Sequence, residues 1–136
     1  MIRQYVLDAN AVLDFIGGGP GSQRVNDLLT EAFRHGTVAL VSVANWGEVF
    51  YSLWLRHGEE KARGALSNLL RLPIQLVPVD LEQAFKAGEI KAVHKIPYVD
   101  CLAAALAELR GAVLVTSDRD FEKLGRRVQV LWIVRR

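Results

Sequence analysis

The sequence predicts an α/β protein, built as a three-layer α/β/α sandwich around a central sheet of five mostly parallel strands. Five short apolar segments alternate with amphipathic helical segments along the chain, and this alternation is typical of parallel sheets joined by right-handed crossovers. The segment AVLVT at 112–116 is apolar until its last residue, as in a central strand covered on both faces. With 136 residues, of which 51% are hydrophobic, the chain can bury one sizeable core. We therefore expect residues 1–136 to form a single domain.

Two strands and four helices are expected in the first half of the chain. The strands are 2–7 and 37–41, and the helices are 8–16, 22–35, 43–57 and 59–70. The glycine-rich stretch at 17–21 ends the first helix, and it lacks the Lys-Ser/Thr pair of a phosphate-binding P-loop. Ser22 and Ser42 are residues that cap helices well. On the helix 43–57 we expect one apolar stripe to face mainly the core, formed by Val43, Trp46, Phe50, Leu53 and Trp54.

Three strands are expected in the second half, at 73–79, 112–116 and 128–134, with helices between them. One helix covers 81–93, and a short one covers 121–124. The helix between Pro97 and Gly111 has suitable residues at both ends, because proline fits a first turn and glycine fits a helix end. Its apolar residues recur at the i, i+3, i+4, i+7 spacing of a single helix face: Val99, Leu102, Ala103 and Leu106.

Acidic residues stand at the points where this topology places functional sites. Asp8 ends the first strand, Asp118 lies just past the strand 112–116, and Asp100 is in the first turn of a helix. In an open parallel sheet, strand C-termini and helix N-termini lie at the same edge. The position of Asp8 fits a helix cap as well as it fits a catalytic carboxylate. Glu48 lies on the polar face of its helix, where spacing alone favours a solvated side chain.

Such a cluster of carboxylates predicts a metal site. Without a cation it is unfavourable, because each carboxylate raises the pKa of the others. Mg²⁺ prefers oxygen ligands, retained waters and phosphate oxygens, and a metal of this kind can activate water for attack at phosphorus. The three histidines are scattered without i, i+3 or i, i+4 pairs, so zinc is not favoured.

The overall composition excludes several other classes. A net charge of +2 is too small to predict nucleic-acid binding by bulk electrostatics. The single cysteine, Cys101, allows no intrachain disulfide, which fits a reducing compartment, and we expect a cytoplasmic protein. No apolar run approaches the roughly 20 residues that span a bilayer, and the first residues do not resemble a signal peptide.

Three blocks of the sequence carry a resemblance to a known family. They are YVLDANAVLDF near the start, VANWGEVFYSL in the middle and YVDCLAAALAELRGAVLVTSDRDF near the end. Together they resemble the PIN domain family, and within it the toxin ribonucleases of VapBC toxin–antitoxin pairs. The resemblance extends over nearly the whole chain. The last block is the most specific of the three.

The resemblance implies a function and a set of site residues. It implies an endoribonuclease dependent on Mg²⁺ or Mn²⁺, which acts as a toxin, forms a homodimer and is neutralised by a VapB-like antitoxin. The four family acids, which are catalytic and hold the metal, fall on Asp8, Glu48, Asp100 and Asp118. Supporting positions fall on Thr116, which would orient the last acid, and on Asn10 and Asp120.

Further residues are candidates for partner contacts, and two alternative functions stay open. The candidate RNA contacts are Arg56, Lys95 and Arg119, and the candidate interface residues are Trp46, Phe50 and Trp54. One alternative is a PIN-like module that binds RNA or protein without catalysis, which a metal-binding assay would reveal. The other is a phosphatase of the haloacid dehalogenase type, which would form a phosphoaspartate at Asp8. For that class the second acid of Asp-x-Asp is replaced here by Asn10.

Overall fold

The computed structural model describes residues 3–134, in which a five-stranded sheet lies at the centre of the molecule. The strand order is β3-β2-β1-β4-β5, and every neighbouring pair is parallel. The strands are β1 (Tyr5–Leu7), β2 (Ala39–Ser42), β3 (Ile74–Val77), β4 (Val113–Thr116) and β5 (Val130–Trp132). The predicted α/β architecture is confirmed, and the sheet is wholly parallel within the described range.

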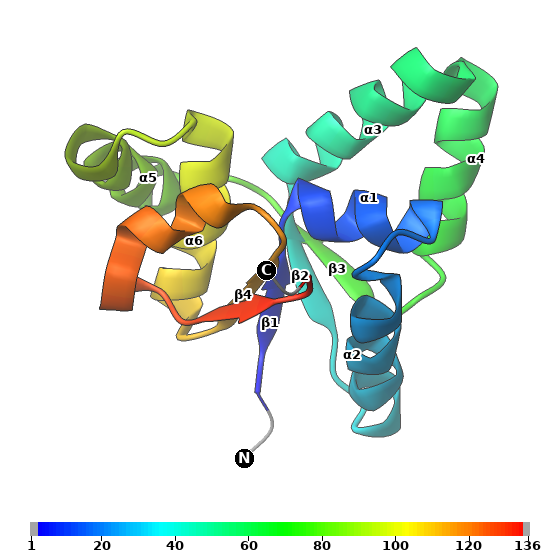
Figure 1. Ribbon diagram of the computed structural model, residues 1–136, viewed down its shortest axis with the longest axis horizontal. Helices are drawn as coiled ribbons and strands as arrows, with labels where there is room; N and C mark the ends of the chain where they lie inside the picture. The colour runs from blue at the N-terminus through cyan, green and yellow to red at the C-terminus, as the bar shows by residue number, and fades with distance from the viewer. Residues whose placement is uncertain (1–2, 135–136) are drawn as a thin grey trace.

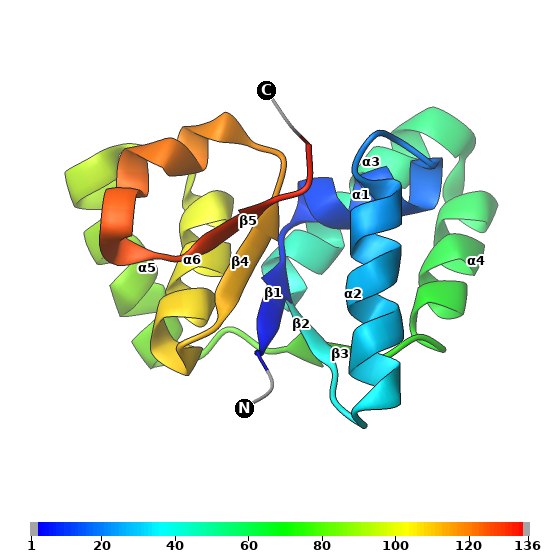
Figure 2. The same cartoon turned by 60° about the horizontal axis from the view of Figure 1, so that its bottom comes forward.

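Helices cover both faces of this sheet, as Figures 1 and 2 show. One side carries α5 (Leu81–His94) and α6 (Tyr98–Arg110), which pack against each other. The other side carries α1 (Ala9–Gly17), α2 (Ser22–Arg34), α3 (Val43–His57) and α4 (Glu59–Leu69). A 3-10 helix, η1 (Arg119–Arg127), follows β4 and is kinked at Gly125.

The core consists of two layers, one on each side of the sheet. Neighbouring strand residues point to opposite faces, so Val6 and Leu114 face α5 and α6 whereas Leu7 and Val115 face α1 to α3. All four side chains are buried. The strands are therefore apolar on both faces, which explains why their sequences lack the polar alternation of an exposed sheet.

Helix ends follow the predicted chemistry at most positions. The Ser42 hydroxyl accepts the Ala44 N–H at 3.3 Å and caps α3. Gly111 ends α6 with φ 59°, in the left-handed region that suits glycine. Ser22 is the first residue of α2 and not its cap, a position that Gly21 takes.

Two expectations need correction. The strands are shorter than expected: β5 covers only the middle of 128–134, and residue 2 of the expected first strand lies outside the described residues. The side of α3 that faces the core also differs, because Asn45, Val49 and Leu53 are its buried residues. Trp54 is 43% exposed. The helix packs against α1, α4 and α6 at once, and so the apolar stripe lies partly in the α3–α4 contact and partly in solvent.

The two central strands bring their carboxyl ends to one level. Leu7 of β1 pairs with Val115 of β4, and the Asp8 N–H donates to the Val115 carbonyl at 3.2 Å. The residues after β1 and β4 are therefore neighbours, although they are far apart in sequence. No helix among residues 3–134 is long and apolar enough to cross a bilayer.

Candidate active site

Asp8 connects β1 to α1 and is 2% exposed. Its Oδ1 accepts the Ala11 N–H at 2.8 Å, which caps α1, and its Oδ2 accepts a hydrogen bond from the Thr116 hydroxyl. Burial raises the pKa of Asp8 to about 7, and repulsion from Asp100 and Asp118 contributes, while the two hydrogen bonds oppose the rise. Asp8 is therefore a helix cap that also belongs to the cluster of acids.

Thr116 is the last residue of β4 and links two of the acids. Its hydroxyl donates to Asp8 Oδ2 and accepts the backbone N–H of Asp118 at 2.9 Å. Asp118 Oδ1 in turn accepts the Asp120 N–H at 2.9 Å and caps η1. The resemblance implied that Thr116 orients the last acid; the structure shows that it contacts the backbone of that acid and the carboxylate of the first.

Asp100 lies in the first turn of α6, where Pro97 begins the helix. Its side chain is half-buried, and its pKa is raised to about 7. Burial is the main cause, followed by repulsion from Asp118, Glu48 and Asp120. The helix N-terminus favours the charged form of an acid at this position, so the rise shows how strongly the neighbouring carboxylates and burial act.

Glu48 reaches the same cluster from α3. Burial raises its pKa, and so does the charge of Asp118. Its Oε1 atom is buried and has no hydrogen-bond partner in the described part of the chain. In Figure 1 the start of α3 lies beside the start of α1, and α1 in turn contacts β4. The structure thus gathers the predicted acids at one edge of the sheet: Asp8, Glu48, Asp100 and Asp118.

The donor set of this cluster fits a hard divalent cation. The four acids offer only carboxylate oxygens as ligands, and one of these oxygens is buried without a hydrogen-bond partner in the part of the chain that the structure describes. The causes of the three raised pKa values include no lysine or arginine of residues 3–134. Within that range, however, no three side chains of the His, Cys, Asp or Glu types are close enough to hold an ion as they stand. The carboxylates would have to move together for an ion to be held.

The supporting acids and amides differ in their placement. Asp120 is exposed, forms an ion pair with Lys123 at 3.9 Å and adds to the rise in the pKa of Asp100. Asn10 is exposed on α1 and takes no part in the hydrogen bonds described for Asp8. Asp120 is therefore at the margin of the cluster, and a role for Asn10 stays a prediction.

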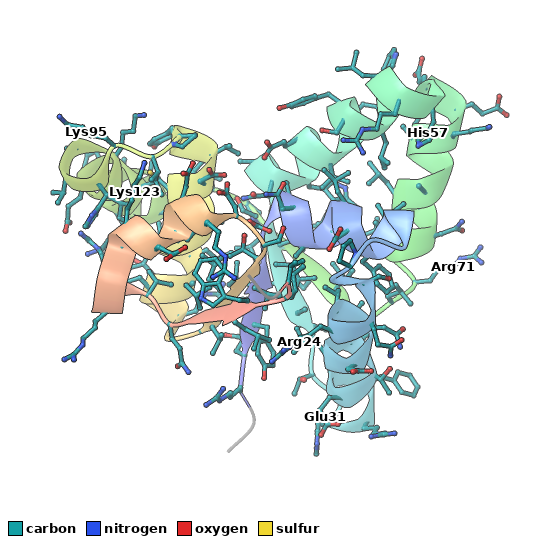
Figure 3. All side chains as sticks on the ribbon, viewed as in Figure 1. Arg24, Glu31, His57, Arg71, Lys95 and Lys123 are labelled. Atoms are coloured by element: carbon teal, nitrogen blue, oxygen red, sulfur yellow. The ribbon has the colours of Figure 1, made fainter. Side chains whose placement is uncertain are left out.

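The candidate RNA contacts lie on three different elements, α3, the end of α5 and η1, and they differ in exposure. Arg56 is exposed on α3, and Lys95 ends α5 at the outer end of the α5–α6 layer (Figure 3). Arg119 is partly buried, with its guanidinium 4.4 Å from the centre of the Trp132 ring and donating to the Val134 carbonyl at 3.1 Å. Arg119 therefore fastens β5 to η1, and its contact with RNA stays a prediction.

Two of the three candidate interface residues, Trp46 and Phe50, line a groove between α3 and α4, and Trp54 lies beside Phe50. Trp46 and Phe50 are half-buried, and Phe50 packs edge-on against Trp54 with ring centres 5.6 Å apart. The Arg63 guanidinium lies 5.0 Å from the centre of the Phe50 ring. The groove has a volume of about 440 Å³, and Leu66 and Leu70 complete its apolar lining. It is an apolar surface with one positive charge beside it.

Sequence reasoning missed Asn45. It is fully buried, and its Oδ1 accepts the N–H of Ala9, the residue after Asp8, at 3.2 Å. A signal for it was present, because Ser42, Asn45 and Glu48 recur at three-residue spacing and so share one face of α3. Spacing alone favours a solvated face here, whereas Asn45 lies against the start of α1.

Comparisons with known proteins agree with this fold. A family model for the PIN domain matches residues 5–127, and the chain therefore belongs to the PIN domain family. The resemblance inferred from the three sequence blocks is thereby confirmed. A comparison with curated proteins found no match.

Several solved structures share the fold at low sequence identity. VapBC2 from Rickettsia felis, bound to a DNA fragment from its promoter, is similar with a TM-score of 0.75 and 19% identity, over 94% of this chain and 97% of that chain. DNA-bound VapBC from Salmonella typhimurium has a TM-score of 0.76 and 18% identity, over 97% and 99%. VapC20 from Mycobacterium tuberculosis, described as a sarcin-ricin loop cleaving toxin, has a TM-score of 0.69 and 18% identity, over 89% and 95%.

Proposed function

We propose that this protein is a metal-dependent endoribonuclease that acts as the toxin of a type II toxin–antitoxin system. The observation that carries the proposal is the set of four carboxylates gathered from β1, α3, α6 and the end of β4, of which Asp8 and Asp100 have a pKa raised to about 7. Acids whose pKa is raised by burial and by neighbouring carboxylates, as for Asp8 and Asp100, are candidates for a functional site. Membership of the PIN domain family supports the same conclusion.

The four acids would hold Mg²⁺ or Mn²⁺. Carboxyl groups that are protonated in the metal-free cluster would then release their protons. When bound, such an ion supplies activation of a water and stabilisation of negative charge at phosphorus. The chain's own residues fix the geometry: Thr116 and Ala11 hold Asp8, and Asp118 is held through its backbone. Glu48 has a raised pKa and an oxygen without a hydrogen-bond partner among residues 3–134, and is therefore suited to receive a proton from the attacking water.

The reaction proposed is hydrolysis of an RNA phosphodiester. The water oxygen forms a bond to phosphorus, the bond from phosphorus to O3′ breaks, and O3′ takes up a proton. The products are a 5′-phosphate and a 3′-hydroxyl. RNA as the substrate class is supported by the similarity to VapC20, whose description names an RNA-cleaving toxin.

The proposed partners are a VapB-like antitoxin and a second copy of this chain. Several similar structures are toxin–antitoxin complexes, and they span nearly the whole of this chain. The apolar groove lined by Trp46 and Phe50 offers a surface for a partner helix, because aromatic side chains at a groove are frequent interface anchors. A short neighbouring reading frame for a small DNA-binding protein would support the toxin assignment.

A direct experiment tests the proposed activity. Purified protein is incubated with a structured RNA hairpin in Mn²⁺ or in excess chelator, beside Asp8→Asn, Asp100→Asn and Asp118→Asn variants. We expect cleavage that needs the metal and is lost in all three variants. Cleavage that persists in chelator would remove the metal proposal, and a fully active Asp100→Asn protein would remove the site assignment. Binding of RNA without any cleavage would favour the non-catalytic module.

The phosphatase alternative finds no support in the geometry of Asp8. Asp8 is 2% exposed, and Asn10 stands where that class has its second acid. The family model that matches residues 5–127 is that of the PIN domain.

A further inference from the structure

A row of polar side chains runs along one face of α3 toward the acid cluster. Ser42, Asn45 and Glu48 recur at three-residue spacing, and Ser42 and Asn45 are both 0% exposed. Buried polar groups in proteins are normally hydrogen-bonded. We therefore ask which groups Asn45 and Glu48 are hydrogen-bonded to.

Asn45 makes one hydrogen bond with the start of α1. Its Oδ1 accepts the Ala9 N–H at 3.2 Å. The first N–H groups of a helix have no partner within that helix, so Asn45 satisfies one of them from a neighbouring element. Since Ala9 directly follows Asp8, this bond fixes the backbone at the point where the first acid leaves β1.

The other half of the Asn45 amide has no partner. With Oδ1 directed at Ala9, the Nδ2 group lies on the opposite side of the amide, and it is buried without a hydrogen bond among residues 3–134. Glu48 Oε1, one helical turn further on, is an unpartnered buried acceptor in the same part of the chain. An unpaired donor and an unpaired acceptor therefore lie on the same face of one helix beside the acids.

We propose that Asn45 is a positioning residue of the acid cluster: its Oδ1 fixes the start of α1 beside Asp8, and its Nδ2 group donates to the Glu48 carboxylate when the cluster holds a divalent cation. This inference rests on the proposed function. Hydrogen bonds to the ligands of a metal typically change its affinity by about 10- to 100-fold. Asn45 thus links the first acid to the second without binding the metal itself.

The test uses two substitutions of nearly equal shape, Asn45→Val and Asn45→Thr, of which only threonine keeps a group that donates and accepts. Mn²⁺ binding to each full-length protein is measured by isothermal titration calorimetry. We expect Asn45→Val to bind Mn²⁺ about 10- to 100-fold more weakly than wild type, and Asn45→Thr to lose less. A valine variant with wild-type affinity, or equal affinities of the valine and threonine variants, overturns the inference.

A matched control separates positioning from the general effect of losing a buried amide. Gln83 on α5 is also buried, donates to the Pro78 carbonyl at 3.0 Å and has one unpartnered atom within the described residues. Gln83→Leu should leave Mn²⁺ affinity unchanged, and an equal loss there overturns the specific role of Asn45. If Asn45→Val does not fold, Asn45→Ala takes its place under the same criteria.

Thermal melting provides a readout that a purely structural role would not move. A structural role lowers the melting temperature equally in chelator and in Mn²⁺, whereas a positioning role lowers it more in Mn²⁺. If Asn45→Val lowers the melting temperature equally in chelator and in Mn²⁺, the inference about Asn45 is overturned. The proposed function still stands in that case, provided that the wild-type protein binds Mn²⁺ and cleaves RNA. A wild-type protein that binds no Mn²⁺ overturns both.

Discussion

The Thr116 hydroxyl donates to Asp8 Oδ2 and so joins the end of β4 to the end of β1 through side chains. The same oxygen accepts the Asp118 N–H, which means that one hydroxyl group sets the positions of two acids. Thr116 is 0% exposed, so its hydroxyl is shielded from bulk solvent.

Replacing Thr116 with valine should weaken both the fold and the site. The substitution keeps the shape but leaves Asp8 Oδ2 and the Asp118 N–H without their partner, which costs about 1–3 kcal/mol for a buried group. Urea unfolding at neutral pH measures the loss, and Thr116→Ser, which keeps the hydroxyl, serves as the control. A valine variant as stable and as active as the serine variant would show that the hydroxyl is dispensable.

Removing one charge from the cluster should help the metal-free protein. Asp100→Asn relieves repulsion from Asp118, Glu48 and Asp120, so we expect its stability in chelator to equal or exceed that of wild type. At a hundredfold excess of metal over the dissociation constant, wild type should gain about 2.7 kcal/mol, and the variant much less. Thermal melting of both proteins in chelator and in Mn²⁺ provides the comparison. Equal gains from metal, or a severe loss of stability in chelator, would make Asp100 a structural residue of the helix start.

Acidification should stabilise the metal-free protein. The pKa values of Asp8 and Asp100 are raised from 3.8 to about 7, so between these values the folded protein holds protons that the unfolded chain has released. Stability therefore falls as pH rises through this window. In chelator, the melting temperature should therefore be higher near pH ~5.5 than near pH ~8, because the folded protein binds these protons more tightly than the unfolded chain.

The double variant Asp8→Asn/Asp100→Asn is the control for this pH effect, and its melting temperature should depend less on pH. With Mn²⁺ present the dependence should reverse, since bound carboxylates must be deprotonated. If the wild-type protein and the double variant melt at the same temperature in chelator at every pH, the raised pKa values of Asp8 and Asp100 are not the cause of the pH dependence.

The groove between α3 and α4 should be needed for association. Alanine at Trp46, Phe50 or Trp54 should weaken dimerisation or antitoxin binding, with a loss of about 2 kcal/mol or more for at least one of them. Analytical ultracentrifugation and binding of the protein encoded beside this gene are the measurements. Phe33, an aromatic residue on α2 that is 75% exposed, gives the control variant Phe33→Ala. If all three alanine variants fold and associate as the wild type does, the groove is not a partner-binding surface.

Most of the fold and of the acid cluster could be predicted from the sequence, because they depend on local patterns. Apolar strands ending at Asp8 and near Asp118, and a helix that begins before Asp100, fix the edge of the sheet at which these acids lie. The place of Asp120 near this cluster could likewise be predicted, because it is two residues after Asp118.

The rotation of α3 could not be predicted in this way. Its apolar stripe shows which residues avoid water, but not whether α1, α4 or α6 covers them. The Asn45 side chain accepts the Ala9 N–H, a contact between residues 36 positions apart. Three-residue spacing places Asn45 on the same side of α3 as Glu48 but does not show which element covers that side. The same limit applies to Glu48, whose burial depends on a neighbouring helix and not on its own spacing.

The bond between Thr116 and Asp8 joins residues 108 positions apart in a chain of 136. A ribosome must therefore make most of the protein before β4 can insert beside β1 and complete the acid cluster. A chain that ends before Thr116 contains Asp8 and Glu48 but lacks one of the two hydrogen bonds to the Asp8 carboxylate. The ribonuclease activity proposed for this chain would therefore arise only once synthesis is nearly finished.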